Sequence, residues 1–323
     1  MSHKTMARRT RLFAALEKRI GTPIDEVAGG DYAAVRAKRA ALQKSAAGRF
    51  VFGTADKKAV IDERFVDLNG SRLRLRIYRP PAAAPGLPIV INFHGGGWVQ
   101  GNPEQSEWAT SRIATRVGAV VISVAYRLAP EHLFPTGVGD CWAATQWIHA
   151  NAAELGGDPD RIAVMGDSAG GNLAAVISLL ARDAGSPRIS RQVLIYPSVE
   201  MYDKYPSEYR NADAPVLTAR NMGAYSRLYL GEAYGTKDFR ASPIRAASHA
   251  GVAAALIQTA ELDPLLDNGV RYAQVLRAAG VDVVSTEYAG AIHGYLSLPG
   301  VVPQADSALD EIVSTLVSDF NAL

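Results

Sequence analysis

The stretch RIAVMGDSAGGNLAAVISLL, residues 161–180, changes from a short apolar strand pattern to a helical pattern around a single serine. Its centre, Gly166-Asp167-Ser168-Ala169-Gly170, matches G-x-S-x-G, in which a serine stands on a sharp turn between a strand and a helix. Glycines permit such a turn, and the helix N-terminus brings backbone N–H groups close to the serine. The stretch therefore predicts an α/β fold in which Ser168 is a nucleophile.

The rest of the chain repeats the alternation of strand and helix. Short apolar runs predict strands, and longer segments with helical spacing lie between them. Runs that are apolar on both faces are typical of parallel strands covered by helices on both sides. The Asn69-Gly70 turn within 63–80 predicts an antiparallel pair in front, which makes an eight-stranded, mostly parallel sheet flanked by helices. The other predicted strands are 88–93, 119–125, 161–165, 191–196, 254–260 and 281–288, and the predicted flanking helices are 139–155, 170–184, 266–279 and 305–320.

Two segments fall outside this alternation. Residues 198–240 separate two strands by more than a crossover helix needs, and they carry six tyrosines. The first 50 residues show helical spacing over 10–20 and 31–48, before any predicted strand. We expect residues 1–50 and about 198–240 to form a mainly helical cap on a catalytic domain of residues 51–323.

Composition excludes several classes of partner. The 323 residues are 48% hydrophobic and 20% charged, and their net charge is +2, so nothing calls for nucleic acid. No window approaches the length of a membrane span. A single cysteine, Cys141, excludes an internal disulfide framework and predicts a cytoplasmic protein, with Cys141 itself a buried structural thiol.

A second glycine-rich segment, His94-Gly95-Gly96-Gly97-Trp98, follows the predicted strand 88–93 directly. Three glycines in a row lose much conformational entropy on folding, so their presence needs a reason. A loop that brings its backbone N–H groups close to a ligand would supply one. The segment lacks the Lys-Ser/Thr pair of a phosphate-binding loop, so an oxyanion is the expected ligand, although a plain turn stays open. We expect His94 to order this loop rather than act as a base.

A nucleophilic serine needs a base and a third group that orients the base. His293 lies in a glycine-flanked loop after the predicted strand 281–288, and Asp263 directly follows the predicted strand 254–260. Glu261 and Asp267 are nearby alternatives for the acid. His3 lies in a terminus that we expect to be loose. The other histidines lie in segments without such presentation and are predicted to be surface or structural residues; they are His132, His149 and His249.

Together these stretches resemble the hormone-sensitive-lipase-like esterases, the bacterial family IV of α/β-hydrolases. The matching motifs are HGGGW, YRLAPEHLFPTGVGDC, GDSAGGNLA, AELDPLLDNG and IHGYLSLPG, over roughly residues 60–300, and Asp167 suggests the GDSAG branch. The resemblance implies an α/β-hydrolase fold with Ser168 as nucleophile, His293 as base and Asp263 as acid. It also implies an oxyanion hole from the backbone N–H groups of Gly95, Gly96 and Ala169, and no metal or organic cofactor. Asn268 stands where that branch often has Glu, and Arg127, Glu131 and Asp140 look like a structural polar network.

The expected activity is hydrolysis of short- to medium-chain acyl esters through an acyl-enzyme. A deacetylase or amidase of a particular acylated metabolite is an alternative, and a non-catalytic protein that binds a small molecule is another. A homodimer through the last edge strand would suit the family. The residues expected to line the substrate pocket are Trp98, Tyr196, Met201, Leu217 and Ile292, with Tyr202, Tyr225, Leu228 and Leu296 as further candidates.

Overall fold

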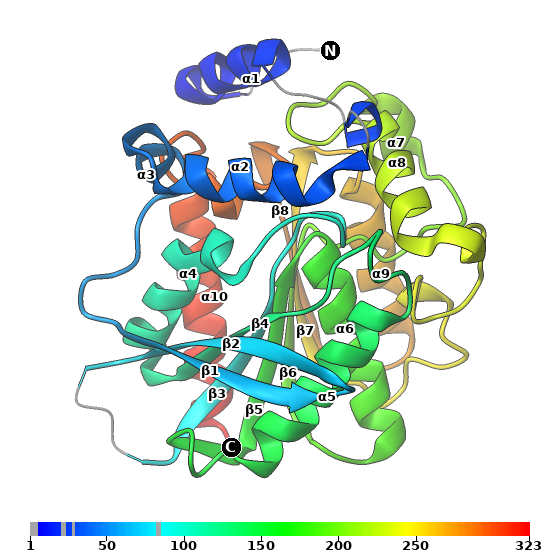
Figure 1. The fold of residues 1–323 in the computed structure, drawn as a ribbon. Coiled ribbons are helices and arrows are strands. Elements are labelled where there is room, and N and C mark those ends of the chain that lie inside the picture. Colours follow the sequence, from blue (N-terminus) through cyan, green and yellow to red (C-terminus); the bar gives the residue numbers. More distant parts are fainter. Residues whose placement is uncertain (1–5, 21–23, 28–29, 82–84) are drawn as a thin grey trace.

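In the computed structural model, which describes residues 6–20, 24–27, 30–81 and 85–323, one eight-stranded sheet runs through the molecule (Figure 1). His3 lies outside the described residues. The strand order is β1-β2-β4-β3-β5-β6-β7-β8; β2 is antiparallel to both β1 and β4, and the other neighbours are parallel. The predicted eight-stranded, mostly parallel sheet is confirmed. The strands are β1 (Val60–Leu68), β2 (Ser71–Arg79), β3 (Leu87–Phe93), β4 (Val120–Ala125), β5 (Gly157–Asp167), β6 (Ile189–Ile195), β7 (Ala254–Leu262) and β8 (Val283–Ile292).

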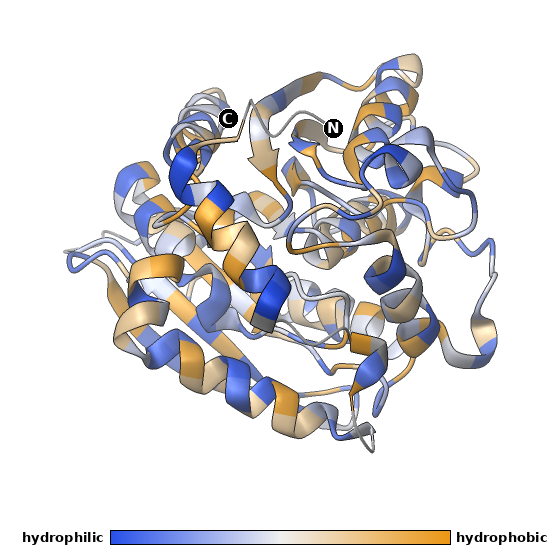
Figure 2. Cartoon of the chain, turned by 90° about the horizontal axis from the view of Figure 1, so that it is seen from above, coloured by the Kyte–Doolittle hydropathy of each residue, from blue (hydrophilic) through white to orange (hydrophobic). Residues whose placement is uncertain are grey.

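Helices cover both faces of the sheet, because alternate strand residues point to opposite sides. On β3, Ile89 and Ile91 belong to one buried core with α5, α6 and α9, whereas Val90 belongs to a second core with α4 and α10. The helices seen from above carry both hydrophilic and hydrophobic residues, as expected of helices with one face on a core (Figure 2). These covering helices are α4 (Glu107–Ile113), α5 (Thr136–Ala150), α6 (Ala169–Ala184), α9 (Leu266–Ala278) and α10 (Gln304–Asn321).

The remaining helices lie at one end of the molecule, toward which the parallel strands run (Figure 1). The N-terminal segment supplies α1, α2 and α3, and residues 206–230 supply α7 and α8. The short turn η1 (Ile24–Glu26) contacts α8, so the two segments meet. The N-terminal helix predicted over 31–48 is two helices, because Ser45 ends α2 and its side chain caps the N-terminus of α3. The bounds are α1 (Arg8–Ile20), α2 (Tyr32–Lys44), α3 (Ala46–Phe52), α7 (Pro206–Arg210) and α8 (Ala219–Leu230).

Short α4 was not predicted from the sequence. It spans only seven residues, and five of them are buried, so it lacks the polar face that periodicity depends on. None of the helices in the described ranges is long and apolar enough to cross a membrane.

Candidate active site

Ser168 stands on the turn between β5 and α6 in a backbone conformation that L-residues rarely adopt, with φ 55° and ψ −115°. Backbone hydrogen bonds hold this conformation: the Ser168 N–H donates to the Ile195 carbonyl at 2.8 Å, and the Ser168 carbonyl accepts from Asn172 at 3.0 Å. The turn is tight enough that a Cβ on Gly170 would lie 1.9 Å from the Phe93 carbonyl oxygen. The strand–turn–helix geometry predicted from G-x-S-x-G is therefore present.

Three side chains from three strand ends meet in one chain of hydrogen bonds. His293, just after β8, places Nε2 3.0 Å from the Ser168 Oγ and Nδ1 2.7 Å from the Asp263 Oδ2. Asp263, just after β7, is fully buried, and its other oxygen accepts from the Leu265 N–H at 2.8 Å. The carboxyl ends of parallel strands share one edge of the sheet, which is why residues 125 and 30 positions apart can meet there.

The two other candidate acids are engaged elsewhere. Glu261 accepts from the Gly290 N–H at 2.7 Å, and Asp267 accepts from the Ser207 N–H at 2.8 Å. Of the three carboxylates considered from the sequence, Asp263 is the one that bonds His293.

The glycine-rich segment after β3 lies beside Ser168, but its amides differ in what they can do. The Gly95 N–H donates to the Asp167 Oδ1 at 2.9 Å, so it is not free for an oxyanion. The N–H groups of Gly96, Gly97 and Ala169 have no hydrogen-bond partner among the described residues. Gly96 and Gly97 also line the pocket that contains Ser168, and Gly95 does not. The prediction of Gly95 as an oxyanion donor is therefore at odds with the structure.

Two buried titratable groups hold this segment. Burial raises the pKa of Asp167 to about 6, an effect that the hydrogen bond from Gly95 partly opposes. His94 is almost completely buried, donates from Nδ1 to the Gly95 carbonyl at 2.9 Å and stacks on Tyr126. Burial lowers the pKa of His94 to about 4, so His94 is neutral at physiological pH. His94 thus orders the loop, as expected from the sequence.

Other polar predictions have mixed outcomes. Arg127 pairs with the fully buried Asp140 at 2.6 Å, but Glu131 pairs with Arg36 of α2 instead. Buried Asn268 accepts from the N–H groups of Val199 and Glu200. His249 bonds the Pro243 carbonyl, and Cys141 is buried and free.

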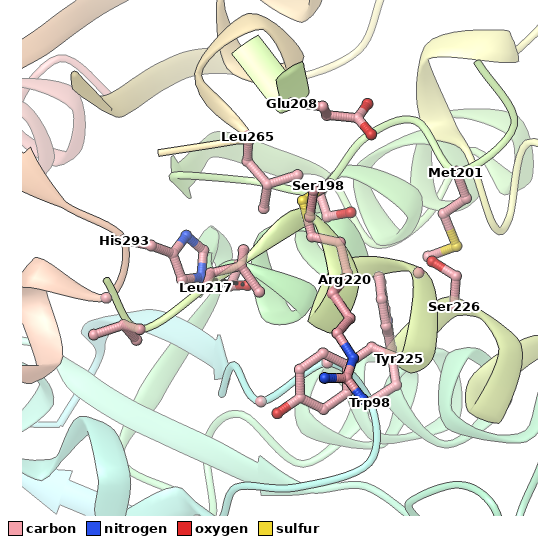
Figure 3. A pocket seen from close by; sticks show the side chains of 18 of the residues that line it. Trp98, Ser198, Met201, Glu208, Leu217, Arg220, Tyr225, Ser226, Leu265 and His293 are labelled. Atoms are coloured by element: carbon pink, nitrogen blue, oxygen red, sulfur yellow. Dashed lines mark hydrogen bonds between the residues drawn. The ribbon is translucent and has the colours of Figure 1, made fainter. Parts of the chain in front are cut away.

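A pocket of about 590 Å³ opens over Ser168 and His293. Figure 3 shows His293 among the side chains that line it. Of the nine residues expected to line it, five do: Trp98, Met201, Tyr202, Leu217 and Tyr225. The others do not: Tyr196, Leu228, Ile292 and Leu296. Tyr196 is 1% exposed and lies beneath the site, where its ring packs against His293 at a centroid distance of 4.8 Å. Ile292 is fully buried in the second core, because the sheet alternation turns it away from the pocket.

Sequence reasoning missed Arg39, which lines the pocket, and its neighbour Arg36, which lies outside the pocket wall and bonds the backbone just after the glycine-rich loop. Arg36 and Arg39 lie three residues apart on α2; Arg36 donates to the Val99 carbonyl at 2.8 Å and Arg39 to Gln100 at 3.1 Å. Their three-residue spacing puts both on one helix face, which is the signal in the sequence that could have found them.

Comparisons with known proteins agree with this geometry. A family model described as the alpha/beta hydrolase fold matches residues 90–297. The chain is 43% identical over 253 residues to the carboxylesterase NlhH of Mycobacterium tuberculosis, covering 77% of this chain and 79% of that protein. It is 34% identical over 289 residues to the ethyl acetate hydrolase of Pseudomonas putida, covering 88% and 90%.

A solved structure is similar over nearly the whole chain. It is the ester-hydrolase EH1AB1 from the metagenome of Lake Arreo, with a TM-score of 0.90 and 34% identity, covering 98% of this chain and 99% of that one. The resemblance to hormone-sensitive-lipase-like esterases is confirmed, while the GDSAG branch stays a prediction. The chain belongs to the α/β-hydrolase family and is a carboxylic ester hydrolase.

Proposed function

We propose that the protein is a serine carboxylesterase that works through an acyl-enzyme, with Ser168 as nucleophile, His293 as base and Asp263 as the group that orients the base. The observation that carries this proposal is the continuous hydrogen-bond chain from Asp263 through His293 to Ser168, which ends in an accessible pocket. Nucleophile, base and orienting acid in hydrogen-bond reach are what acyl transfer requires.

In the proposed mechanism, His293 Nε2 takes the Ser168 proton as Oγ attacks the ester carbonyl carbon. Asp263 accepts a hydrogen bond from the Nδ1–H, which keeps that proton on Nδ1 and leaves Nε2 free to act as the base. The tetrahedral intermediate collapses as the protonated His293 gives its proton to the leaving alcohol. Water then attacks the acyl-enzyme, with His293 as base again, and the acid leaves.

The negative charge of the tetrahedral intermediate needs donors already in place. We assign them to the N–H groups of Ala169, Gly96 and Gly97, because these have no partner within the described part of the chain. Gly97 replaces Gly95, whose N–H is bonded to Asp167. Each such donor contributes about 10²–10³ to the rate in acyl-transfer enzymes.

The proposed substrates carry short- to medium-chain acyl groups. A pocket of about 590 Å³ has room for such a group, and one relative is named for hydrolysis of ethyl acetate. The helices of residues 1–50 and 198–240 act in this proposal as a cap, since both segments contribute to the pocket wall through Arg39, Met201 and Tyr225.

The test compares wild type with Ser168→Ala on 4-nitrophenyl esters from acetate to palmitate. We expect rates that peak at short or medium chains and vanish in the variant, while the thermal unfolding curve is kept. An active Ser168→Ala enzyme would refute the assignment. Activity confined to acetylated metabolites or amides would favour the deacetylase or amidase alternative, and failure of an organophosphate to label Ser168 would favour a binding protein.

The proposal also includes a homodimer and a cytoplasmic location. β8 is the last strand of the sheet and pairs with β7 alone within the described residues, so its outer edge is available to a second copy. The single, buried Cys141 is consistent with a reducing compartment. Light scattering that gives the mass of one 34.4 kDa chain at micromolar concentration would contradict the dimer.

A further inference from the structure

The wall of the substrate pocket contains an arginine without a carboxylate partner. Arg39 of α2 is half-buried, lines the pocket that holds Ser168, and donates from Nη1 to the neutral Gln100 Oε1 at 3.1 Å. No ion pair of Arg39 is present among the described residues. Arg36, three residues earlier on the same helix, is the contrast: it lies outside the pocket wall and pairs with Glu131 at 2.5 Å.

Gln100 connects Arg39 to a second donor. Its side chain is buried, and while Oε1 accepts from Arg39, Nε2 donates to the Tyr225 hydroxyl at 3.0 Å. One amide group therefore holds the arginine and the tyrosine close together. Tyr225 belongs to α8, so the two donors come from separate parts of the chain and meet over the glycine-rich loop.

The Tyr225 hydroxyl has a proton to give. It is the acceptor in its bond with Gln100, and its own O–H donates to no group that the structure describes. Burial raises the pKa of Tyr225, which keeps the hydroxyl protonated at neutral pH. The ring packs so closely on the loop that a Cβ on Gly97 would lie 2.4 Å from it, so the hydroxyl is well positioned.

The carboxylates of the pocket wall are occupied elsewhere. Glu200 and Asp203 both pair with Arg245, and the Asp167 carboxylate accepts from the glycine-rich loop. Glu208 lies at the far end of the pocket from Tyr225 (Figure 3) and accepts from a backbone N–H. A cation and a neutral hydroxyl donor therefore face one part of the pocket, and no carboxylate among the described residues forms a hydrogen bond with either of them.

We propose that Arg39 and Tyr225, held together by Gln100, bind a carboxylate of the substrate, so that the preferred substrates are esters that also carry a free acid group. A guanidinium and a hydroxyl on one carboxylate form charge-assisted hydrogen bonds, which are stronger than neutral ones. This inference rests on the proposed esterase function, since it assigns the substrate class of that same site.

The test uses pairs of esters that differ in a carboxylate and an isosteric isopropyl group. On the acyl side, mono-4-nitrophenyl adipate is compared with 4-nitrophenyl 6-methylheptanoate. On the alcohol side, 4-acetoxybenzoate is compared with 4-isopropylphenyl acetate. The quantity measured is the ratio of kcat/KM for the acid ester to kcat/KM for the neutral ester, after subtraction of the rate without enzyme. A ratio is independent of the fraction of folded enzyme.

We expect Arg39→Gln to lower this ratio about tenfold in at least one pair, because a charged hydrogen bond to the substrate is lost. Arg39→Lys should keep most of the ratio, and Tyr225→Phe should lower it severalfold. Arg36→Gln is the matched control: it removes the same charge from the same helix outside the pocket wall, and the ratio should stay at its wild-type value.

Two results would overturn the inference. One is an Arg39→Gln ratio equal to wild type in both pairs. The other is an equal fall in Arg36→Gln, which would indicate a general effect of charge rather than a binding site. Failure of the esterase proposal is distinguishable, since it would appear as neutral-ester hydrolysis that survives Ser168→Ala.

Discussion

Replacing Asp263 with asparagine tests the proposed orientation of His293 with almost no change in shape. The Leu265 N–H donates to Oδ1 at 2.8 Å, so the asparagine must keep its oxygen there and turn its NH₂ toward the His293 Nδ1. In the wild type, Nδ1 lies 2.7 Å from Oδ2 and donates to it. An NH₂ group in the place of Oδ2 can only donate, so Nδ1 must accept the hydrogen bond. The ring proton then moves to Nε2, where it blocks uptake of the Ser168 proton.

The expected cost is large. In serine proteases the corresponding change lowers kcat about 10⁴-fold, which is about 5 kcal/mol of transition-state stabilisation. We expect a loss of about 10³–10⁴ in kcat for 4-nitrophenyl butyrate, with the thermal midpoint within a few degrees of wild type. Glu261→Gln is the control, because it neutralises a nearby carboxylate that bonds Gly290 instead. Asp263→Asn activity within tenfold of wild type would refute the reasoning.

Two further predictions concern stability. Burial raises the pKa of Asp167 to about 6, so the folded protein binds a proton on this carboxyl more tightly than the unfolded chain does. The resulting contribution to the stability of wild type is complete below about pH 4 and is lost as pH rises through 6. The free energy of unfolding of Asp167→Asn, measured with urea, should therefore rise relative to that of wild type between pH 4 and 6. Unfolding free energies of the two proteins that change in parallel with pH would contradict this. Asn172→Ala leaves two buried carbonyl oxygens, each now bonded at 2.8 Å, without donors. We expect the free energy of unfolding to fall by about 2–4 kcal/mol. A fall below about 1 kcal/mol would contradict the claim that both carbonyl oxygens stay buried without donors.

The sheet was predictable because its signals are local. Apolar runs such as that of β3 are buried on both faces, and Asn69-Gly70 closes the one tight hairpin that the sequence indicates. The break between α2 and α3 was less visible, because Ser45 interrupts an otherwise helical spacing by a single side-chain cap. Local patterns thus give the elements and leave their ends less certain.

The candidate site divides in the same way. Ser168, Asp263 and His293 each follow a strand, so topology alone brings them to one edge of the sheet. Side-chain direction needed coordinates. Tyr196 and Ile292 also follow or end strands, but alternation and packing turn them into the core rather than the pocket. The sequence therefore predicts that both residues lie at strand ends, but it does not predict to which side their side chains point.

The bond between Asp167 and Gly95 explains why the first glycine of the loop differs from the next two. Asp167 immediately precedes Ser168, so its 2.9 Å bond ties the loop after β3 to the same turn that presents the nucleophile. The N–H groups of Gly96 and Gly97 are thereby held at a fixed place relative to the Ser168 hydroxyl, across 72 residues of sequence. Donors that are fixed before reaction need no reorganisation as charge develops. In the proposed oxyanion hole, the Asp167 carboxylate therefore contributes by holding the loop that carries these donors, and it does so through the Gly95 N–H.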